Sequence, residues 1–407
     1  MTHPVAKSTT AVAAVAGPAV TGIALAVVLI WTTDAAGASL KTCVAGIERA
    51  AVKSGVKRSV ASAAFADFEV DETVTRSASR QAEFDIPVWD YMAFLVDDER
   101  IADGRAMLDK HEEVLGRIEK RYGIDRHILV ALWGVESDYG RRQGGHFIPH
   151  ALANLVCNGR RARFFRSELI HALKIVSRGD LALDHLRGSW AGAFGQTQFM
   201  PSTYRRLAVD FDRDGKRDLV NSVPDALASA ANYLRRAGWR TGQHWGREVR
   251  LPKDWKGRAG RKRTATLRTW AKRGIRRVDG GPLTAGIRAG LILPAGRDGP
   301  AFLVYRNFNA LFAYNAAESY ALAISHLADR LQGGDAFVTA WPTDDPGLSR
   351  AERLELQKRL IANGYDIGEA DGRIGPITRE GIRKAEEKLG MTPTGRPGRK
   401  IFDALGG

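Results

Sequence analysis

Glu136 is the residue of this chain that is best placed for acid–base chemistry, and it lies in the stretch Val130–Gly140. Apolar residues from Ile128 to Val135 recur at helical spacing, which predicts a packed core helix with this carboxyl group near its end. Desolvation and the negative end of the helix both favour the protonated carboxyl, as a general acid requires. We expect Gly140 to stop the helix and leave Glu136 facing a cleft. The alternative is an ordinary surface glutamate before a helix cap.

A second segment, residues 188–204, combines small residues with groups that could stack on a sugar-like polymer and hydrogen-bond to it. The small residues, which let a backbone approach a ligand closely, are Ala191, Gly192, Ala193 and Gly195. The aromatic and amide groups are Trp190, Gln196, Gln198, Phe199 and Tyr204. A tightly packed turn would explain the small residues but not the two glutamines.

These two segments together resemble the lytic murein transglycosylase B family. The resemblance covers about residues 40–332 and includes further motifs at Gln81–Phe84, Val88–Tyr91, Gly104–His111, Asp225–Leu234, Gly238–Trp239, Asn307–Phe308 and Tyr314–Asn315. Phe194 departs from the family, which usually has Met there, and we expect this to change packing more than chemistry.

The resemblance implies cleavage of the β-1,4 bond between N-acetylmuramic acid and N-acetylglucosamine in peptidoglycan, with a 1,6-anhydromuramyl end and no water consumed. It makes Glu136 the single acid and base, whereas most glycosidases use two carboxyl groups. Asp138 is unsuited to be a second one, because positions two apart on a helix do not share a face.

The resemblance also assigns substrate-binding residues. Ser189 and Gln198 are expected to hydrogen-bond the substrate near the cleaved bond, and Phe199 to line the groove. The remaining cleft residues implied by the family motifs are Tyr233, Tyr314, Asn315, Tyr320 and, through a looser motif, Tyr91.

The charge and the N-terminus indicate where the chain works. The formal net charge is +15, but no nucleic-acid motif is present, and carboxylate-rich peptidoglycan is a sufficient anionic partner. Residues 1–38 are predicted to be a signal peptide or an N-terminal membrane anchor, with an apolar run from Ala11 to Trp31 and a cleavage candidate at Ala36–Ala38. We therefore expect an exported, periplasmic monomer with possible membrane association. A disulfide between Cys43 and Cys157 is allowed there but not implied.

The fold is predicted to be mainly α, with a lysozyme-like α+β catalytic region over residues 39–332. Helices are expected at Arg105–Arg121, Arg163–Val176 and Ala310–Leu331, and short strands at Glu248–Leu251 and Ala301–Val304. The basic stretch Lys256–Arg277 is interpreted as a solvated loop or strand pair rather than a binding site.

A linker is predicted at residues 333–348, followed by a small three-helix domain at 349–405. The run Asp371–Thr378 resembles the peptidoglycan-binding domain type 1, although Ala385-Glu386 stands where that family usually has Phe-Gln or Tyr-Gln. Wall binding by this domain and a merely stabilising appendage both remain open.

Residues Asp210–Asp218 resemble the start of a calcium loop, with acids at positions 1, 3, 5 and 9 and Gly at position 6. The candidate ligands are Asp210, Asp212, Asp214, the backbone carbonyl of Lys216, and Asp225 from the next helix. Position 12 is Asn221 instead of Glu, so any calcium would bind weakly and be structural, and no cofactor is required. A polar turn is the alternative.

Two other functions remain open beside the lyase. A muramidase would use water and would need a second carboxylate across the cleft. A wall-binding scaffold with a dead active site would bind peptidoglycan without cutting it.

Overall fold

A computed structural model describes residues 32–79, 86–158 and 161–406. The chain divides into two compact units, Met1–Cys43 and Val44–Gly407, and the second unit holds every element discussed below. The apolar run at Ala11–Trp31 and the motif Gln81–Phe84 lie outside the described residues. Within the described ranges, no helix is both long enough and apolar enough to cross a bilayer.

Helices make up most of the second unit, as predicted. They are α1 (Thr32–Lys53, which begins in the first unit), α2 (Arg58–Ala63), α3 (Glu72–Ser79), α4 (Val88–Leu95), α5 (Asp98–Lys110), α6 (Glu112–Tyr122), α7 (Arg126–Ser137), α8 (Ile148–Asn158), α9 (Ala162–Arg178), α10 (Pro201–Leu207), α11 (Val223–Arg236), α12 (Leu267–Lys272), α13 (Arg306–Asn315), α14 (Glu318–Leu331), α15 (Arg350–Ala362), α16 (Pro376–Lys388) and α17 (Arg399–Ala404). The mainly α fold class is therefore confirmed.

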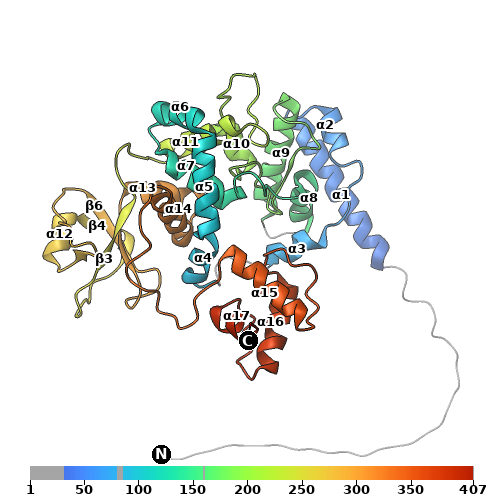
Figure 1. Ribbon diagram of the computed structural model, residues 1–407. Coiled ribbons are helices and arrows are strands. Elements are labelled where there is room, and N and C mark those ends of the chain that lie inside the picture. The colour runs from blue at the N-terminus through green and yellow to red at the C-terminus, as the bar shows by residue number, and fades with distance from the viewer. Residues whose placement is uncertain (1–31, 80–85, 159–160, 407) are drawn as a thin grey trace, which may run out of the picture. The chain divides into compact units, whose positions relative to one another are not determined.

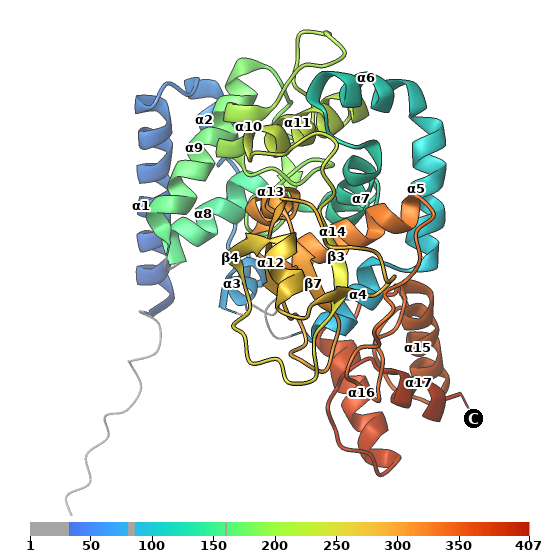
Figure 2. The same cartoon turned by 90° about the vertical axis from the view of Figure 1, so that its left-hand side faces the viewer.

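Helix α7, which carries Glu136, lies in the main hydrophobic core. Asp125 caps its first turn by accepting a hydrogen bond of 2.7 Å from the backbone N–H of His127. Its residues from Ile128 to Gly134 are all buried, and α7 packs against α14, α5, α11 and α6. Figures 1 and 2 show α7 and α14 next to each other among these helices. A helix with so much buried surface is a rigid support for the side chain of Glu136.

Two of the predicted helices are interrupted. The pattern at Arg105–Arg121 spans α5 and α6, which meet at His111. The pattern at Ala310–Leu331 spans α13 and α14, because Ala316 adopts a left-handed conformation with φ of 45°. An apolar period continues across such a break when both helices face the same core, so the period alone did not reveal either break. The helix predicted at Arg163–Val176 is confirmed as α9.

The small β element is a five-stranded antiparallel sheet. Its strands are β3 (Gly246–Arg250), β4 (Gly260–Thr266), β5 (Arg276–Arg277), β6 (Arg288–Ile292) and β7 (Ala301–Val304), in the order β4-β6-β7-β3-β5. Strands β3 and β7 confirm the two short strands that were predicted. The basic stretch Lys256–Arg277 was expected to be a solvated loop or strand pair; it instead forms β4, α12 and β5, and α12 buries Leu267 and Trp270. A separate two-stranded ribbon pairs β1 (His146–Phe147) with β2 (Arg187–Gly188).

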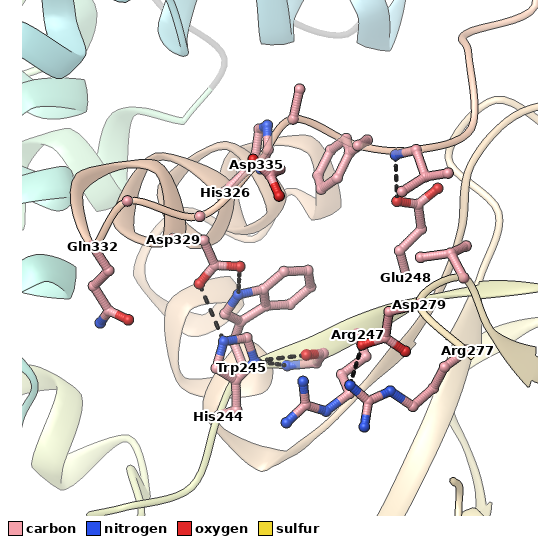
Figure 3. A pocket seen from close by; sticks show the side chains of 17 residues that line it. His244, Trp245, Arg247, Glu248, Arg277, Asp279, His326, Asp329, Gln332 and Asp335 are labelled. Atoms are coloured by element: carbon pink, nitrogen blue, oxygen red, sulfur yellow. Dashed lines mark hydrogen bonds and ion pairs between the residues drawn. The ribbon is translucent and has the colours of Figure 1, made fainter. Parts of the chain in front are cut away.

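The stretch predicted to be a linker is bonded to the sheet. Both carboxylate oxygens of Glu248 accept backbone N–H groups, from Val338 and Thr339, at 2.8 Å each. Phe337 stacks on the buried ring of His326 with 3.8 Å between centroids. Glu248, His326, Phe337 and Val338 line a cavity of about 510 Å³. Figure 3 shows Glu248 and His326 at this cavity.

The C-terminal module, α15 to α17, has its own core of Leu348, Leu356, Leu360, Ile367, Ile382, Ala385 and Ile401. The unusual pair Ala385-Glu386 has a structural explanation within it. Ala385 is part of this core, and the buried carboxylate of Glu386 accepts bonds from the Thr394 hydroxyl and the Gly395 N–H, both at 2.7 Å. These bonds hold the loop before α17.

Buried ion pairs attach the C-terminal module to the catalytic region beside α4 (Figure 1). Arg396 donates to both carboxylate oxygens of Asp90, at 2.6 and 2.5 Å, and Asp90 is only 4% exposed. Arg350 donates to Asp97 at 3.1 Å and to Asp138 at 2.7 Å. Losing one partner of such a pair leaves an uncompensated buried charge, so these bonds fix how the module docks.

Candidate functional site

Glu136 lies in the last turn of α7 and is half-buried. The helix ends at Ser137, earlier than the predicted stop at Gly140, because Asp138 and Tyr139 both adopt left-handed conformations. Tyr139 is held in that strained conformation by burial, by its ring packing on Gly134 and by a bond of 2.7 Å from its hydroxyl to the carbonyl of Arg100. The turn leaves Glu136 lining a cleft of about 380 Å³, as expected.

The phenol of Tyr320 donates a hydrogen bond to the Glu136 carboxylate. Tyr314 lies beside it, and its own hydroxyl donates to the carbonyl of Thr197 at 2.8 Å. Burial, followed by the charge of Glu136, raises the pKa of both phenols well above the ordinary value. Both hydroxyls therefore stay protonated, and Tyr320 can fix the orientation of the Glu136 carboxyl group.

Aromatic residues form a wall next to these groups. Tyr314 stacks against Tyr320 with 6.4 Å between ring centroids, and lies 4.6 Å from Tyr233 and 5.9 Å from Phe199. Tyr91, on α4, is half-buried and lines the cleft with Glu136. Aromatic faces of this kind suit the apolar faces of sugar rings.

The segment 188–204 is bonded to the end of α7. The hydroxyl of Ser137 donates to the carbonyl of Gln196 at 2.6 Å and accepts from the N–H of Gly140 at 2.9 Å. Ser189 accepts the N–H of Ala193 at 3.0 Å. The amide nitrogen of Gln198 donates to the carbonyls of Gln143 and Gly195 at 2.9 Å each. Gln198 can therefore meet a ligand only through its carbonyl oxygen, as an acceptor.

Gly192 and Gly195 of this segment are packed against other parts of the protein and do not face an open cleft. A Cβ on Gly195 would lie 2.7 Å from the carbonyl oxygen of Leu219, and one on Gly192 would lie 2.7 Å from the side chain of Leu152. Both also have positive φ angles, of 76° and 96°. Turn conformation and close packing account for these two positions, as the packed-turn alternative holds. Phe194, at the departure from the family, is fully buried against Tyr204.

The other two carboxylates that line the cleft are held by arginines. Asp90 is bound by Arg396, and Asp138 by Arg350 and Arg141. Burial raises the pKa of Asp138, but the hydrogen bonds from Arg141 and the charge of Arg350 outweigh it, so this pKa lies below its ordinary value. Both groups act as charged partners of arginines, which does not suit a second proton-transfer group.

Asn315 differs from the other predicted binding residues. It is exposed at the end of α13, just before the left-handed Ala316. The motif residue Asn307 is fully buried instead and bonds to the backbone of Arg240 and Gln243, so its role is to hold a loop.

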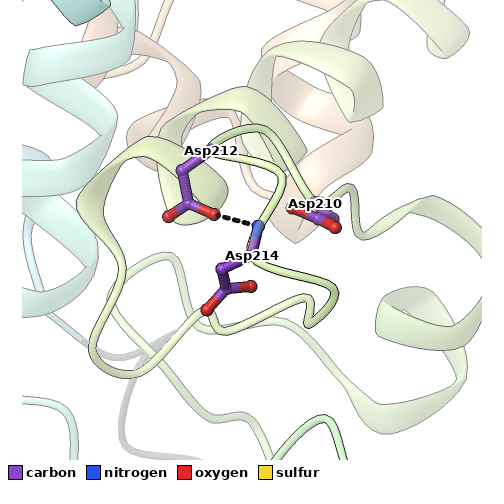
Figure 4. Close-up of side chains that lie close together, drawn as sticks. All are labelled: Asp210, Asp212 and Asp214. Carbon is purple, nitrogen blue, oxygen red and sulfur yellow. Dashed lines mark hydrogen bonds between the residues drawn. The ribbon is translucent and has the colours of Figure 1, made fainter.

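The acidic loop brings three of its predicted ligands together. The carboxylates of Asp210, Asp212 and Asp214 have oxygen atoms within 4.8 Å of one another. Figure 4 shows the three side chains gathered in the loop. Oδ1 of Asp210 is buried and has no hydrogen-bond partner among the described residues, which fits a cation. Both oxygens of Asp225 instead accept loop N–H groups, from Phe211 at 2.6 Å and Asp218 at 2.9 Å. Burial raises the pKa of Asp225 to about 6.

Known proteins match this chain over most of its length. Residues 39–329 match the family described as "Transglycosylase SLT domain", and residues 349–405 match the "Putative peptidoglycan binding domain". The chain belongs to the transglycosylase SLT domain family. The family recognised from the motifs, together with its C-terminal domain, is thereby confirmed.

Individual relatives support the same family assignment. The chain is 38% identical over 153 residues to membrane-bound lytic murein transglycosylase B of Escherichia coli (strain K12); this match covers 37% of the chain and 42% of that curated relative's length. It is similar to SltB3 from Pseudomonas aeruginosa in complex with NAG-NAM-pentapeptide, with 43% identity and a TM-score of 0.73 over 90% of this chain and 99% of that one. The Escherichia coli lytic transglycosylase SLT35 in complex with calcium is 28% identical, with a TM-score of 0.63 over 72% and 92% of the two chains.

Sequence reasoning missed two kinds of site residue. Gln143 and Thr197 offer backbone carbonyls to Gln198 and Tyr314, and backbone roles leave little trace in residue type. Several arginines, some from the C-terminal module, also line the cleft. Only their positive charge could have signalled them, and arginine is abundant throughout this basic chain.

Proposed function

We propose that this protein is a peptidoglycan lytic transglycosylase that cleaves the β-1,4 bond between N-acetylmuramic acid and N-acetylglucosamine. One observation carries the proposal. Glu136 ends a buried helix at a cleft and receives the Tyr320 hydroxyl, while the other two carboxylates of that cleft are bound by arginines. A site with one usable carboxyl group suits a reaction whose nucleophile belongs to the substrate.

In the proposed reaction, protonated Glu136 donates its proton to the glycosidic oxygen as the bond from muramyl C1 to that oxygen breaks. The resulting carboxylate takes the proton of the muramyl O6 hydroxyl, and O6 bonds to C1. One C–O bond replaces another, Glu136 regains its proton, and no water is consumed. The products are a 1,6-anhydromuramyl end and a free O4 hydroxyl on N-acetylglucosamine.

The surrounding residues have distinct parts in this proposal. Tyr320 orients the carboxyl group of Glu136, and Gln198 accepts a hydrogen bond from a sugar hydroxyl or N-acetyl N–H through its carbonyl oxygen. Ser189, whose oxygen already accepts a backbone N–H, donates its hydroxyl proton to the substrate. The aromatic wall of Phe199, Tyr233 and Tyr314 contacts sugar faces, Tyr91 borders the muramyl position, and Asn315 contacts glycan further out.

The decisive experiment is mass spectrometry of products released from purified sacculi in water enriched in heavy oxygen. We expect anhydromuropeptides without heavy oxygen from the wild type and none from Glu136→Gln. Glu113→Gln is the matched control, because its side chain is 90% exposed and, among the described residues, forms an ion pair only with Arg117 on α6. Reducing ends that carry heavy oxygen would support the muramidase instead. Binding to sacculi without any release would support the silent scaffold.

We also propose that the loop Asp210–Lys216 binds calcium through its three clustered carboxylates and the carbonyl of Lys216, while Asp225 holds the loop from inside. The buried, unpartnered oxygen of Asp210 supports this, and the calcium complex of the related SLT35 is consistent with it. Calcium would cross-link the loop that precedes α11 and take no part in the reaction.

We also propose the domain division that was predicted from the sequence. It has an export segment at 1–38, a catalytic region at 39–332, a linker at 333–348 and a wall-binding module at 349–405. Both cysteines are disulfide-bonded, which supports a periplasmic location because disulfides persist in oxidising compartments. Membrane attachment through the N-terminus and a monomeric state complete the proposal.

A further inference from the structure

The cleft that contains Glu136 is built by two parts of the chain. Tyr91 on α4 and Glu136 on α7 come from the catalytic region. Arg353 on α15, Arg379 on α16 and Arg373 from the loop between them come from the C-terminal module. The buried ion pairs of Asp90 and Asp97 hold the module in this place. The module therefore borders the catalytic carboxyl group and is more than a remote wall anchor.

The cleft carries excess positive charge. Five arginines line it, Arg100, Arg142, Arg353, Arg373 and Arg379, against three carboxylates. Two of these carboxylates, Asp90 and Asp138, make their short ion pairs with arginines that do not line the cleft, namely Arg396, Arg350 and Arg141. The residues that line the cleft therefore carry more positive than negative charge.

Arg100 is the arginine least satisfied by the protein. It is 4% exposed, its Nε and Nη1 are buried without a hydrogen-bond partner among the described residues, and its Nη2 is 3.9 Å from Asp138. A buried guanidinium without hydrogen-bond partners is unfavourable, and because these two donors are shielded from solvent, Arg100 adds positive charge beside the cleft rather than a direct contact to a ligand.

Arg353 and Arg379 also sit in an unfavourable environment. Arg353 is 9% exposed and stacks over the ring of Phe94 at 4.3 Å, as Arg100 does at 5.8 Å. Burial, with the nearby charge of Arg379, lowers the pKa of Arg353 to about 10, and burial lowers that of Arg379. Both remain charged at neutral pH, so an anion placed between them would relieve their repulsion and desolvation.

We propose that the arginines of this cleft bind the carboxylates of the peptide stem on the muramyl residue next to the cleaved bond. This rests on the proposed function, because it takes Glu136 to mark where the muramyl sugar lies. The sugars of the strand are uncharged, whereas the stem is attached to the muramyl residue itself and carries carboxylates. Guanidinium groups bind carboxylates through two parallel hydrogen bonds. The C-terminal module would thus select peptide-bearing strands.

The experiment compares initial rates on two substrates, peptide-bearing strands and strands stripped of peptides by an amidase. Stripped strands keep a free lactyl carboxylate, the other possible source of the same chemistry. The variants are Arg373→Gln alone and with Arg379→Gln, and the corresponding Lys substitutions keep charge but lose the planar fork. The matched control is Lys384→Gln, which removes an exposed charge from α16 outside the cleft.

We expect the double Gln variant to lose about tenfold in kcat/KM on peptide-bearing strands, mainly through KM, because it loses two charge-assisted contacts. On stripped strands we expect less than about a twofold change, with the Lys variants intermediate. Arg373 is exposed, so Arg373→Gln keeps the test valid if the double variant fails to fold.

Three results would overturn the inference. A loss confined to stripped strands would assign the arginines to the free lactyl carboxylate, and an equal loss on both substrates would assign them to the strand in general. No loss on either would leave them without a binding role. A wild type that releases no anhydromuropeptides from either substrate would instead refute the proposed function, so the two failures are distinguishable.

Discussion

Tyr320→Phe tests whether the phenol that donates to Glu136 contributes to catalysis. Tyr320 is 2% exposed, and Phe keeps its ring against Tyr314 while it removes only the hydroxyl. A hydrogen bond to a charged group is worth about 1.5–3 kcal/mol. If the bond serves the reaction, its loss lowers kcat by roughly 10- to 150-fold, since about 1.4 kcal/mol corresponds to a factor of ten.

The assay is the initial rate of anhydromuropeptide release over a range of strand concentrations, which separates kcat from KM. The matched control is Tyr204→Phe, because Tyr204 is 1% exposed and its hydroxyl donates to the carbonyl of Arg217, away from the cleft. The control should lose stability but retain kcat. A Tyr320→Phe enzyme with wild-type kcat, or an equal loss in both variants, would refute the orienting role.

Three further predictions concern stability and docking. Burial lowers the pKa of His326 to about 4. Between pH 6.5 and 4 the unfolded chain therefore binds a proton at this residue and the folded chain does not, so the free energy of unfolding should fall by about 3 kcal/mol as the pH falls through this window. His326→Gln should flatten that part of a pH-dependent denaturation curve. Asp90→Asn removes one of the two carboxylates that bind Arg396, the other being Asp345, and should weaken docking by about 1.5–3 kcal/mol, measured as faster proteolysis at residues 333–348 than in a Lys384→Gln control. Calcium at about 100 times its Kd should stabilise the wild type by about 2.7 kcal/mol in thermal melts. Asp212→Asn should abolish that gain, and an equal gain in both proteins would contradict the site.

Motifs in the sequence singled out the side chains that we propose for the site. Glu136 lies near the end of a strongly apolar helical run, and Ser189, Phe199 and Tyr314 stand in patterns that resemble the family. The short strands at β3 and β7 were also visible, because turn residues bound them on both sides.

What the sequence did not predict depends on contacts between distant residues. Arg396 lies 306 residues after Asp90, and Arg350 lies 253 after Asp97, so no local pattern links the partners. The left-handed Ala316 and Tyr139 are equally hidden, because neither residue type favours that conformation and tertiary packing imposes it. The docking of the C-terminal module, and with it the arginine side of the cleft, could be found only from the structure.

Because both parts of the chain line the cleft, ligand binding there and docking of the C-terminal module are coupled equilibria. A ligand that touches Glu136 on α7 and Arg379 on α16 can make all its contacts only while the two parts are together. This coupling is reciprocal: if docking of the module raises the affinity for a strand by some factor, a bound strand raises the docking equilibrium constant by the same factor. Arg350 extends this coupling, because it joins α15 to Asp138, the residue that follows the last residue of α7. Glycan in the cleft would therefore act as a clamp between the two parts.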